Sequence, residues 1–355
     1  MDSRDRVLSA IFLEEPDRVP TLEVGVSNIV LKKIFPSMSE RKKPIILSKL
    51  GLDSLIIWPF LNDKNNKQLN NNQYLDEFGR LFTKKISFSM SDFYLQGTLN
   101  SPEKYELFPR PDPYDPWRVE YFEKYVKSSR EEIFLIPCCG SVFEVAAEAV
   151  GFVDFFRYMQ SNPSFIRRVL KDHADYTIAC GNALVDAGAE AVLDADDFAY
   201  KTGPFISPKC WMEFVFPELR RVVENFHKKG IPVLLHTDGN ISLLIEGIIK
   251  AGIDAVQPLE PTAGMKLSEV KEKYGDKICP IGNIDVAYTL ASGTRDDVIN
   301  EVKEAIRNAA YGGGYILGSG HTIHDSILPQ NFLTMLNAAK KYGRYPIQTA
   351  EVYEK

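Results

Sequence analysis

Two polar residues directly follow a short apolar run near the middle of the chain. The run Val233–Leu235 ends at His236, and Asp238 comes two residues later. Side chains two apart on a strand share a face, so His236 and Asp238 point the same way if the run is a strand. An imidazole and a carboxylate aimed together can bind a metal ion, relay a proton or fix one another's orientation. The structural alternative is a histidine hydrogen-bonded to a nearby carboxylate at a turn.

Polar side chains also follow most of the other short apolar runs. The chain has five histidines, of which three come at such run ends, while His173 and His227 lie in helical patterns and are expected to be solvated. Converging imidazoles and carboxylates suit a metal site, acid–base catalysis or a polar cradle for a ligand. A set of His236, Asp238 and His321 with one open position would suit a catalytic divalent metal, with zinc the first candidate. The polar residues at the run ends are Glu23, Asp194, Asp196, Asp197, His236, Asp238, Gln257, Glu260, Asn283, Asp285, His321 and His324.

Eight apolar runs supply the elements that would bring these side chains together. They cover residues 20–24, 54–58, 133–137, 191–194, 232–236, 254–258, 278–282 and 314–318. Apolar rather than alternating runs are typical of parallel strands buried on both faces. Helical patterns lie between most of them, and several runs begin after a glycine such as Gly51, Gly188 or Gly252, which is typical of a helix end.

Eight strands with intervening helices predict an α/β fold, a (β/α)8 TIM barrel that spans residues 1–355 as one domain. In such a barrel the chemistry lies at the carboxyl ends of the strands. An open doubly wound sheet is the alternative, but no Gly-x-Gly-x-x-Gly motif follows the first run.

Residues 60–125 break the rhythm and are predicted to be an insertion after the second strand. The segment contains an asparagine-rich stretch, a hairpin pattern that turns near Gly79, and a proline-rich stretch over residues 109–116. Loops of this length at a barrel mouth often act as lids. The insertion is therefore either a lid, with aromatic residues that could cover a flat substrate, or a packed surface excursion.

Composition excludes several classes of protein. The chain has 355 residues, 45% of them hydrophobic and 25% charged, with a formal net charge of −6. An acidic chain lacks the basic face that a nucleic-acid-binding protein needs. No apolar stretch approaches the roughly 18 residues of a transmembrane helix, and the first residues lack a signal-peptide core. We expect a cytoplasmic protein with no nucleic-acid or membrane partner.

Nucleophilic catalysis has weaker support. The five cysteines include no Cys-x-x-Cys pair, which argues against a disulfide framework or a zinc finger. Cys138 and Cys139 follow the third run, so that a thiol could face the mouth. The glycines of residues 312–314 precede a strand rather than open a helix, and a phosphate loop is not expected there.

The motifs at these strand ends resemble the uroporphyrinogen decarboxylase superfamily, and the resemblance covers the C-terminal half of the chain. It extends more loosely to Asp17-Arg18-Val19-Pro20. The resemblance implies a (β/α)8 barrel with its cleft at the strand carboxyl ends. The matching motifs are Asp196-Asp197 with Ser207-Pro208, His236-Thr237-Asp238-Gly239-Asn240, Leu259-Glu260-Pro261, Ile281-Gly282-Asn283-Ile284-Asp285, Gly293-Thr294, Gly312-Gly313-Gly314-Tyr315-Ile316-Leu317 and His321.

The superfamily contains two chemistries, and the first strand helps to separate them. True decarboxylases carry an arginine-rich Met-Arg-Gln-Ala-Gly-Arg motif there, whose cations bind the acidic side chains of the porphyrinogen. The equivalent stretch here, Leu22–Asn28, has no arginine. A substrate with many carboxylates would meet Glu23 instead, and like charges in a buried cleft are costly. Porphyrinogen decarboxylation is therefore disfavoured.

The other branch contains cobalamin-dependent methyltransferases, and the chain resembles this branch more. Members that act on coenzyme M bind zinc through a His-x-Cys pair and a later cysteine. In this chain Asp238 occupies the position of the first of those cysteines, and His321 lies near the position of the second. A His/Asp/His site is harder than His/Cys/Cys and suits an oxygen or nitrogen donor better than a thiolate. The resemblance thus implies demethylation of a small O- or N-methyl compound, such as a methoxylated aromatic, onto cob(I)alamin.

The roles implied for the remaining site residues complete this hypothesis. Glu260 is a candidate proton donor, Asp197 and Glu23 are further candidate catalytic residues, and Asn240 and Asn283 are candidate cofactor-binding residues. The chain has no Asp-x-His-x-x-Gly corrinoid-binding signature, so the resemblance implies that cobalamin arrives on a separate corrinoid protein. A homodimer is one assembly compatible with this interpretation.

Two rival hypotheses remain open. A decarboxylase of another substrate would use Asp197 or His321 to stabilise a protonated intermediate and would need neither metal nor corrinoid. A barrel kept as a non-enzymatic binding protein would lose only stability when His236 or His321 is replaced by alanine.

Overall fold

The apolar runs of the sequence form a parallel sheet in the computed structural model, which describes residues 1–84, 92–129 and 131–347. Neighbouring strands follow the order β1-β2-β7-β8-β11-β12-β13, and all of their pairs are parallel. Each strand overlaps one of the predicted runs. The strands are β1 (Leu22–Glu23), β2 (Ser54–Ile57), β7 (Phe134–Gly140), β8 (Val192–Ala195), β11 (Val233–His236), β12 (Ala255–Gln257) and β13 (Cys279–Pro280).

The eighth predicted strand, residues 314–318, joins the two edges of this sheet. Ile316 forms a parallel bridge with Ile281, just beyond β13, and Leu317 forms one with Thr21, just before β1. The sheet therefore closes into a ring through this segment. The prediction of a (β/α)8 barrel is confirmed, and an open doubly wound sheet is excluded.

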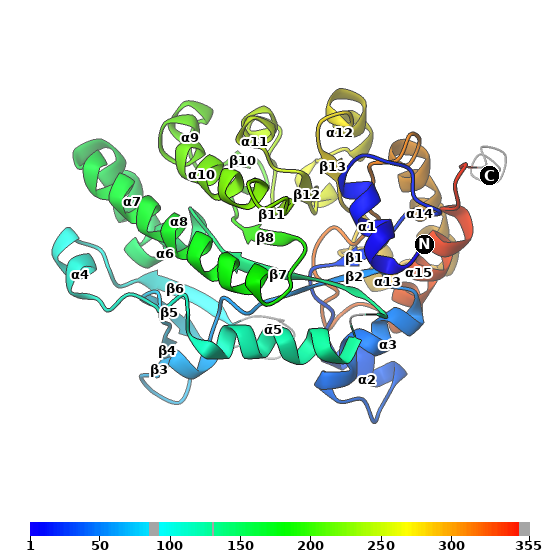
Figure 1. Cartoon of the computed structure of the whole chain (residues 1–355), viewed down its shortest axis with the longest axis horizontal. Coiled ribbons are helices and arrows are strands. Elements are labelled where there is room, and N and C mark those ends of the chain that lie inside the picture. The colour runs from blue at the N-terminus through cyan, green and yellow to red at the C-terminus, as the bar shows by residue number, and fades with distance from the viewer. Residues whose placement is uncertain (85–91, 130, 348–355) are drawn as a thin grey trace.

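Helices surround the barrel on its outer side, as Figure 1 shows for α8, α10, α11 and α12. Their apolar stripes cover the outer faces of the strands, which is why those strands carry so few polar residues. The helices are α1 (Ser3–Ile11), α2 (Asn28–Ile34), α3 (Lys43–Leu50), α4 (Pro102–Leu107), α5 (Pro116–Ser129), α6 (Glu144–Val150), α7 (Phe152–Ser161), α8 (Pro163–Asp186), α9 (Pro208–Phe214), α10 (Phe216–His227), α11 (Ile245–Ala251), α12 (Leu267–Tyr274), α13 (Thr289–Ser292), α14 (Arg295–Ala309) and α15 (Pro329–Tyr342), with short 3-10 helices at Glu40–Lys42, Asp63–Asn65 and Pro261–Ala263.

The recurring glycines end helices, as their pattern predicts. Gly51 and Gly252 cap α3 and α11 in the left-handed conformation, with φ of 103° and 96°. That conformation costs glycine nothing and would strain any residue with a Cβ. Gly313 has a packing role as well, because a Cβ there would lie 2.4 Å from the backbone of Glu14. Among the described residues, no helix is long and apolar enough to cross a membrane.

The segment between β2 and β7 forms a small antiparallel sheet followed by α4 and α5. Its strands are β3 (Lys67–Gln68), β4 (Gln73–Leu75), β5 (Arg80–Thr83) and β6 (Phe93–Gly97). The predicted hairpin is confirmed, since β4 pairs with β5 around Gly79. This small sheet packs on α6, where Arg80 forms a 2.7 Å ion pair with Glu148. Because α6 follows the carboxyl end of β7, the insertion lies beside that end of the barrel (Figure 1). A role as a lid stays a prediction.

The insertion changes the surroundings of one histidine. His173 on α8 was expected to be solvated, but it is only 8% exposed and stacks on Phe78 of the insertion, with ring centroids 5.8 Å apart. That expectation is wrong because the helix pattern around His173 says nothing of the distant segment that covers it. His227 is 40% exposed at its side chain and bonds Asp254, in keeping with its expected surface position.

Candidate functional site

The carboxyl end of β11 places His236 at the mouth of the barrel. His236 lies between Ala195 of β8 and Gln257 of β12 in the strand register. Its Nδ1 is hydrogen-bonded to the side-chain oxygen of Gln257. A carbonyl oxygen can only accept, so this contact places a proton on Nδ1. Nε2 faces Asp238, whose Oδ2 lies 3.9 Å away.

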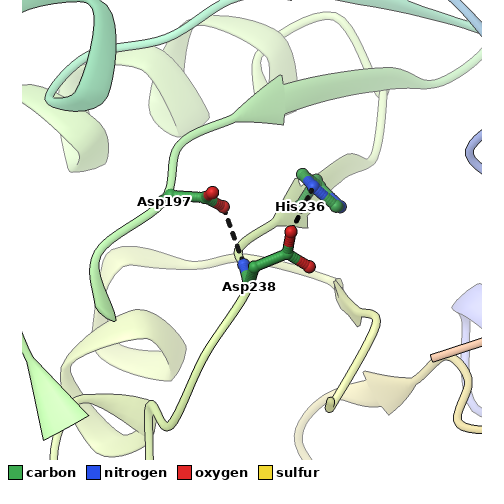
Figure 2. A group of neighbouring side chains, drawn as sticks. All are labelled: Asp197, His236 and Asp238. Atoms are coloured by element: carbon green, nitrogen blue, oxygen red, sulfur yellow. Dashed lines mark hydrogen bonds and ion pairs between the residues drawn. The ribbon is translucent and has the colours of Figure 1, made fainter. Parts of the chain in front are cut away.

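Asp197 meets this pair from the neighbouring strand end. It follows β8, and its Oδ1 accepts a 2.7 Å hydrogen bond from the backbone N–H of Asp238. Figure 2 shows the three side chains of Asp197, His236 and Asp238 gathered at one point. One ligand atom from each of the three lies within 4.8 Å of those from the other two. The sequence places Asp197 among the catalytic candidates, and the structure adds that its carboxylate lies close enough to His236 and Asp238 to share a metal ion with them.

The carboxylates of Asp197 and Asp238 lie close together and are largely buried, so a bound cation would stabilise their negative charges. Burial, then the charge of Asp238, raise the pKa of Asp197 to about 6. Burial alone would also raise the pKa of Asp238, but the nearby His236 and His321 outweigh it and hold that pKa below its ordinary value. Two close carboxylates with little water between them compete for positive charge.

His321 contributes the second imidazole from the loop after the eighth strand. Its Nε2 lies 3.1 Å from Asp238 Oδ2, closer than the Nε2 of His236. The hydrogen bond with Asp238 raises the pKa of His321 above its ordinary value. Its side chain is 45% exposed, against 13% for His236. The structure thus brings His236, Asp238 and His321 together, as the sequence predicts, with His321 on the open side.

One atom of the cluster is left without a contact. Asp238 Oδ1 is buried and has no hydrogen-bond partner among the described residues. A buried carboxylate oxygen without a partner costs free energy, which a bound cation would recover. One imidazole nitrogen and carboxylate oxygens are ligands that zinc and other divalent transition metals accept. The residues present therefore fit a divalent metal ion.

The other residues named from the motifs hold the loops of the mouth. Both oxygens of Glu260 accept hydrogen bonds, one from the Gly239 N–H at 3.0 Å and one from the Thr262 hydroxyl. The side-chain amides of Asn240 and Asn283 donate to backbone carbonyl oxygens 2.9 and 3.1 Å away. The contacts of Glu260 and Asn240 join the turn after β11 to the loop after β12, and the contact of Asn283 joins that loop to the one after β13. The proton-donor and cofactor-binding roles of these residues stay predictions.

Glu23 lies at the end of β1, away from the carboxylate pair. It is 1% exposed, and its two oxygens contact the backbone N–H and the hydroxyl of Ser319. The same hydroxyl donates to the carbonyl oxygen of His321. Burial raises the pKa of Glu23 to about 8, against the opposing hydrogen bonds from Ser319. Glu23 is thus a neutral acid at pH 7, linked to the backbone of His321 through one hydroxyl.

The pKa of Glu23 predicts a pH dependence of stability. Its folded-state pKa is raised above the unfolded value, so its contribution to the free energy of unfolding is complete below about pH 4.5 and lost as the pH rises through 8. Between those limits we expect a fall of roughly 1 kcal/mol per pH unit from this group. Urea unfolding from pH 5 to 8 measures it. Glu23→Gln, which mimics the neutral acid, should remove this slope, whereas the exposed Glu272→Gln should keep it. Identical slopes in wild type and Glu23→Gln would contradict the assignment.

Two residues near the site were not identified from the sequence. Glu144, at the start of α6, has its Oε2 3.5 Å from the Asp197 N–H, and burial together with the charge of Asp197 raises its pKa well above the ordinary value. Trp58, just after β2, lies edge-on to His236 with ring centroids 6.4 Å apart. Trp58 is the last residue of the apolar run 54–58 and comes directly after β2, so its place at a strand end is a signal in the sequence, but its apolar side chain made it look like part of the strand.

A cysteine nucleophile has no support from the structure. Cys138 and Cys139 are both fully buried, and burial raises the pKa of each thiol well above its ordinary value. The reactive form of cysteine is the thiolate, which such surroundings disfavour. A catalytic role for either thiol is therefore disfavoured.

Comparison with known proteins places the chain among barrels of one family. The family model described as Uroporphyrinogen decarboxylase (URO-D) matches residues 93–342. A uroporphyrinogen decarboxylase of Pseudoalteromonas atlantica is 27% identical over 249 residues, which cover 66% of this chain and 67% of that protein. One of Alkalilimnicola ehrlichii is 28% identical over 261 residues, or 69% and 68% of the two chains.

Two solved structures share the fold. A methyltransferase from Methanosarcina mazei matches with a TM-score of 0.76 at 18% identity, over 96% of this chain and 99% of that one. A B12-independent methionine synthase from a Shewanella species matches with a TM-score of 0.56 at 13% identity, over 91% and 96%. At these identities the likeness is one of fold.

Proposed function

The chain belongs to the uroporphyrinogen decarboxylase family, and on that premise we propose that it is a methyltransferase. It takes a methyl group from a small O- or N-methyl compound, such as a methoxylated aromatic, and passes it to cob(I)alamin carried by a separate corrinoid protein. The fold shared with the Methanosarcina methyltransferase supports the reaction class. The hard donor set at the mouth supports an oxygen or nitrogen leaving group rather than a thiol.

The observation that carries this proposal is the carboxylate of Asp238. It lies between two imidazoles, and one of its oxygens is buried without a hydrogen-bond partner among the described residues. We propose that Asp197, His236 and Asp238 hold zinc there, with His321 on the open side as the further ligand that the sequence suggests. Zinc would supply Lewis acidity toward the heteroatom that leaves the methyl group.

The chain's own residues prepare the site for that transfer. Gln257 orients the His236 ring with Nε2 toward Asp238. The backbone N–H of Asp238 holds the carboxylate of Asp197 in place. Glu260 is the proposed proton donor to the departing oxygen or nitrogen.

A decarboxylase is the second candidate, because the curated relatives carry that name. The first strand disfavours a porphyrinogen as the substrate. Glu23 is buried there, and no arginine lies in the stretch Leu22–Asn28. A substrate with several carboxylates would find no cation on this segment.

One assay separates these two candidates. The chain is mixed with zinc, cob(I)alamin and a panel of methoxylated aromatics and methylamines, and the cobalamin spectrum is followed for methylation while released CO2 is measured. We expect methylation from one donor class, dependent on added metal, and no CO2. Release of CO2 from an acid without metal, or no methylation over the whole panel, would contradict the proposed function.

A further inference from the structure

A cavity of about 480 Å³ lies between α8 and the insertion. Its walls include Phe78 and Tyr105 from the insertion and His173 and Tyr176 from α8. None of the residues that line it belongs to the cluster at the barrel mouth. The rings of Phe60 and Trp58 stand between the two places, in successive contacts of 6.3 to 6.4 Å from Phe78 to His236.

The walls of the cavity suit a flat ring. The Phe78 ring stacks on His173 and meets Tyr176 edge-on at 5.2 Å. Tyr105 forms part of the same lining, and its hydroxyl donates to Asp172 at 3.2 Å, which fixes the ring. Aromatic rings prefer offset or edge contacts at such separations, so a planar aromatic ligand would find a matching wall.

Arg110 gives the cavity a positively charged group, and its contacts with the described residues use only some of its N–H donors. Its guanidinium lies 3.8 Å from the centroid of the Tyr105 ring and donates to the Tyr105 carbonyl at 2.6 Å. Its Nη2 is 3.6 Å from Asp172, beyond hydrogen-bond distance. Arg168 lines the same cavity and reaches Asp172 only at 3.9 Å, with Glu106 as its nearer partner. Guanidinium has five N–H donors and binds carboxylates in a fork.

Asp172 also lines the cavity and forms ion pairs with both Arg110 and Arg168, so this one carboxylate is shared between two guanidinium groups. Asp175 is held by Lys171 and Arg221, each at 2.6 Å. His173 is neutral, since burial and then the positive charges of Arg80 and Arg110 lower its pKa to about 3.

We propose that this cavity is a second binding site, separate from the barrel mouth, for a small planar aromatic carboxylate. The ring lies against Phe78 and Tyr105, and the carboxylate binds the Arg110 guanidinium. The proposal goes beyond the methyltransferase function and does not depend on it, because no residue of the cluster at the mouth takes part.

Calorimetric titration of the full chain with benzoate tests the site. We expect one saturable binding event, at least tenfold weaker for cyclohexanecarboxylate, which lacks the flat ring, and for benzamide, which lacks the charge. Arg110→Gln should raise the Kd of benzoate at least tenfold, and Ala179→Leu should fill the cavity and also weaken binding. The exposed Arg220→Gln is the matched control and should leave the Kd unchanged.

A His236→Ala variant distinguishes the cavity from the mouth. Benzoate should bind this variant as it binds wild type. Three results would overturn the proposal: no benzoate binding to wild type, unchanged binding in folded Arg110→Gln, or loss of binding in His236→Ala, which would place the ligand at the mouth. If Ala179→Leu fails to fold, Arg110→Gln decides the question alone.

Discussion

Replacement of Asp238 with asparagine is expected to lower methyl transfer at least about 100-fold, the upper range seen when even an outer partner of a metal ligand is lost. Asparagine keeps the volume of the side chain but removes the charge that faces both His236 and His321. It also replaces one carboxylate oxygen with an NH2 group that cannot bind a cation. The rate of cob(I)alamin methylation, measured with the best donor of the panel, checks this expectation.

The same substitution should do little to folding, because Asp238 Oδ1 has no hydrogen-bond partner among the described residues and the asparagine carbonyl oxygen can keep the contact of Oδ2 with His321. The unfolding midpoint in urea separates a lost reaction from a lost fold. Asp276→Asn is the matched control, since Asp276 is 75% exposed at its side chain and lies far along the chain from the cluster. An Asp238→Asn enzyme that stays folded and transfers methyl at the wild-type rate would show that the carboxylate has no part in the reaction.

Replacement of Arg118 with methionine is expected to destabilise the protein by about 3–5 kcal/mol, the cost of leaving a buried charge without its partner. Arg118 is 1% exposed at its side chain and forms a 2.7 Å ion pair with Glu77, itself 6% exposed. It also donates to the carbonyl oxygens of Phe60 and Asp112, at 2.5 and 3.0 Å. One side chain thus ties the insertion and α5 to the end of β2. Urea unfolding measures the loss.

A second variant shows whether the unpaired carboxylate causes that loss. Arg118→Met with Glu77→Gln should recover part of the stability, because the double variant buries no unpaired charge. Arg157→Met is the control, at a side chain that is 60% exposed, and should change the free energy of unfolding by less than about 0.5 kcal/mol. A loss below about 1 kcal/mol for Arg118→Met would contradict the role given to this ion pair.

The barrel could be predicted from the sequence because its strands are buried on both faces. Each run such as residues 54–58 or 232–236 is apolar for a local reason, the packing of one strand against helices outside and side chains inside. Helix-ending glycines such as Gly51 and Gly252 are equally local, since the required φ depends on the residue itself. The order of strands around the barrel then follows from the order along the chain.

The site was predicted in part for the same reason. The carboxyl ends of parallel strands meet at one rim, so the sequence alone predicts that His236, Asp238 and His321 lie close together. The contacts of Asp197 depend on the turn after β8, which directs its carboxylate to the Asp238 N–H. No pattern of neighbouring residues indicates that turn, so the sequence alone does not predict that Asp197 lies beside Asp238.

Features that depend on contacts between distant segments could not be predicted from the sequence. The burial of His173 depends on Phe78, 95 positions earlier by their numbers. Glu144 comes near Asp197 only because α6 begins at the mouth after β7. Such pairings follow from how loops pack, and no periodicity in a single segment encodes them.

Zinc content is the most direct test of the central claim that Asp197, His236 and Asp238 form a metal site. The full chain is dialysed against zinc, then against zinc-free buffer, and the metal retained per chain is measured by elemental analysis, with His236→Ala and Asp238→Asn treated alike. We expect close to one zinc per chain in wild type and almost none in either variant. Wild type that retains no zinc, or variants that retain as much as wild type, would contradict the account.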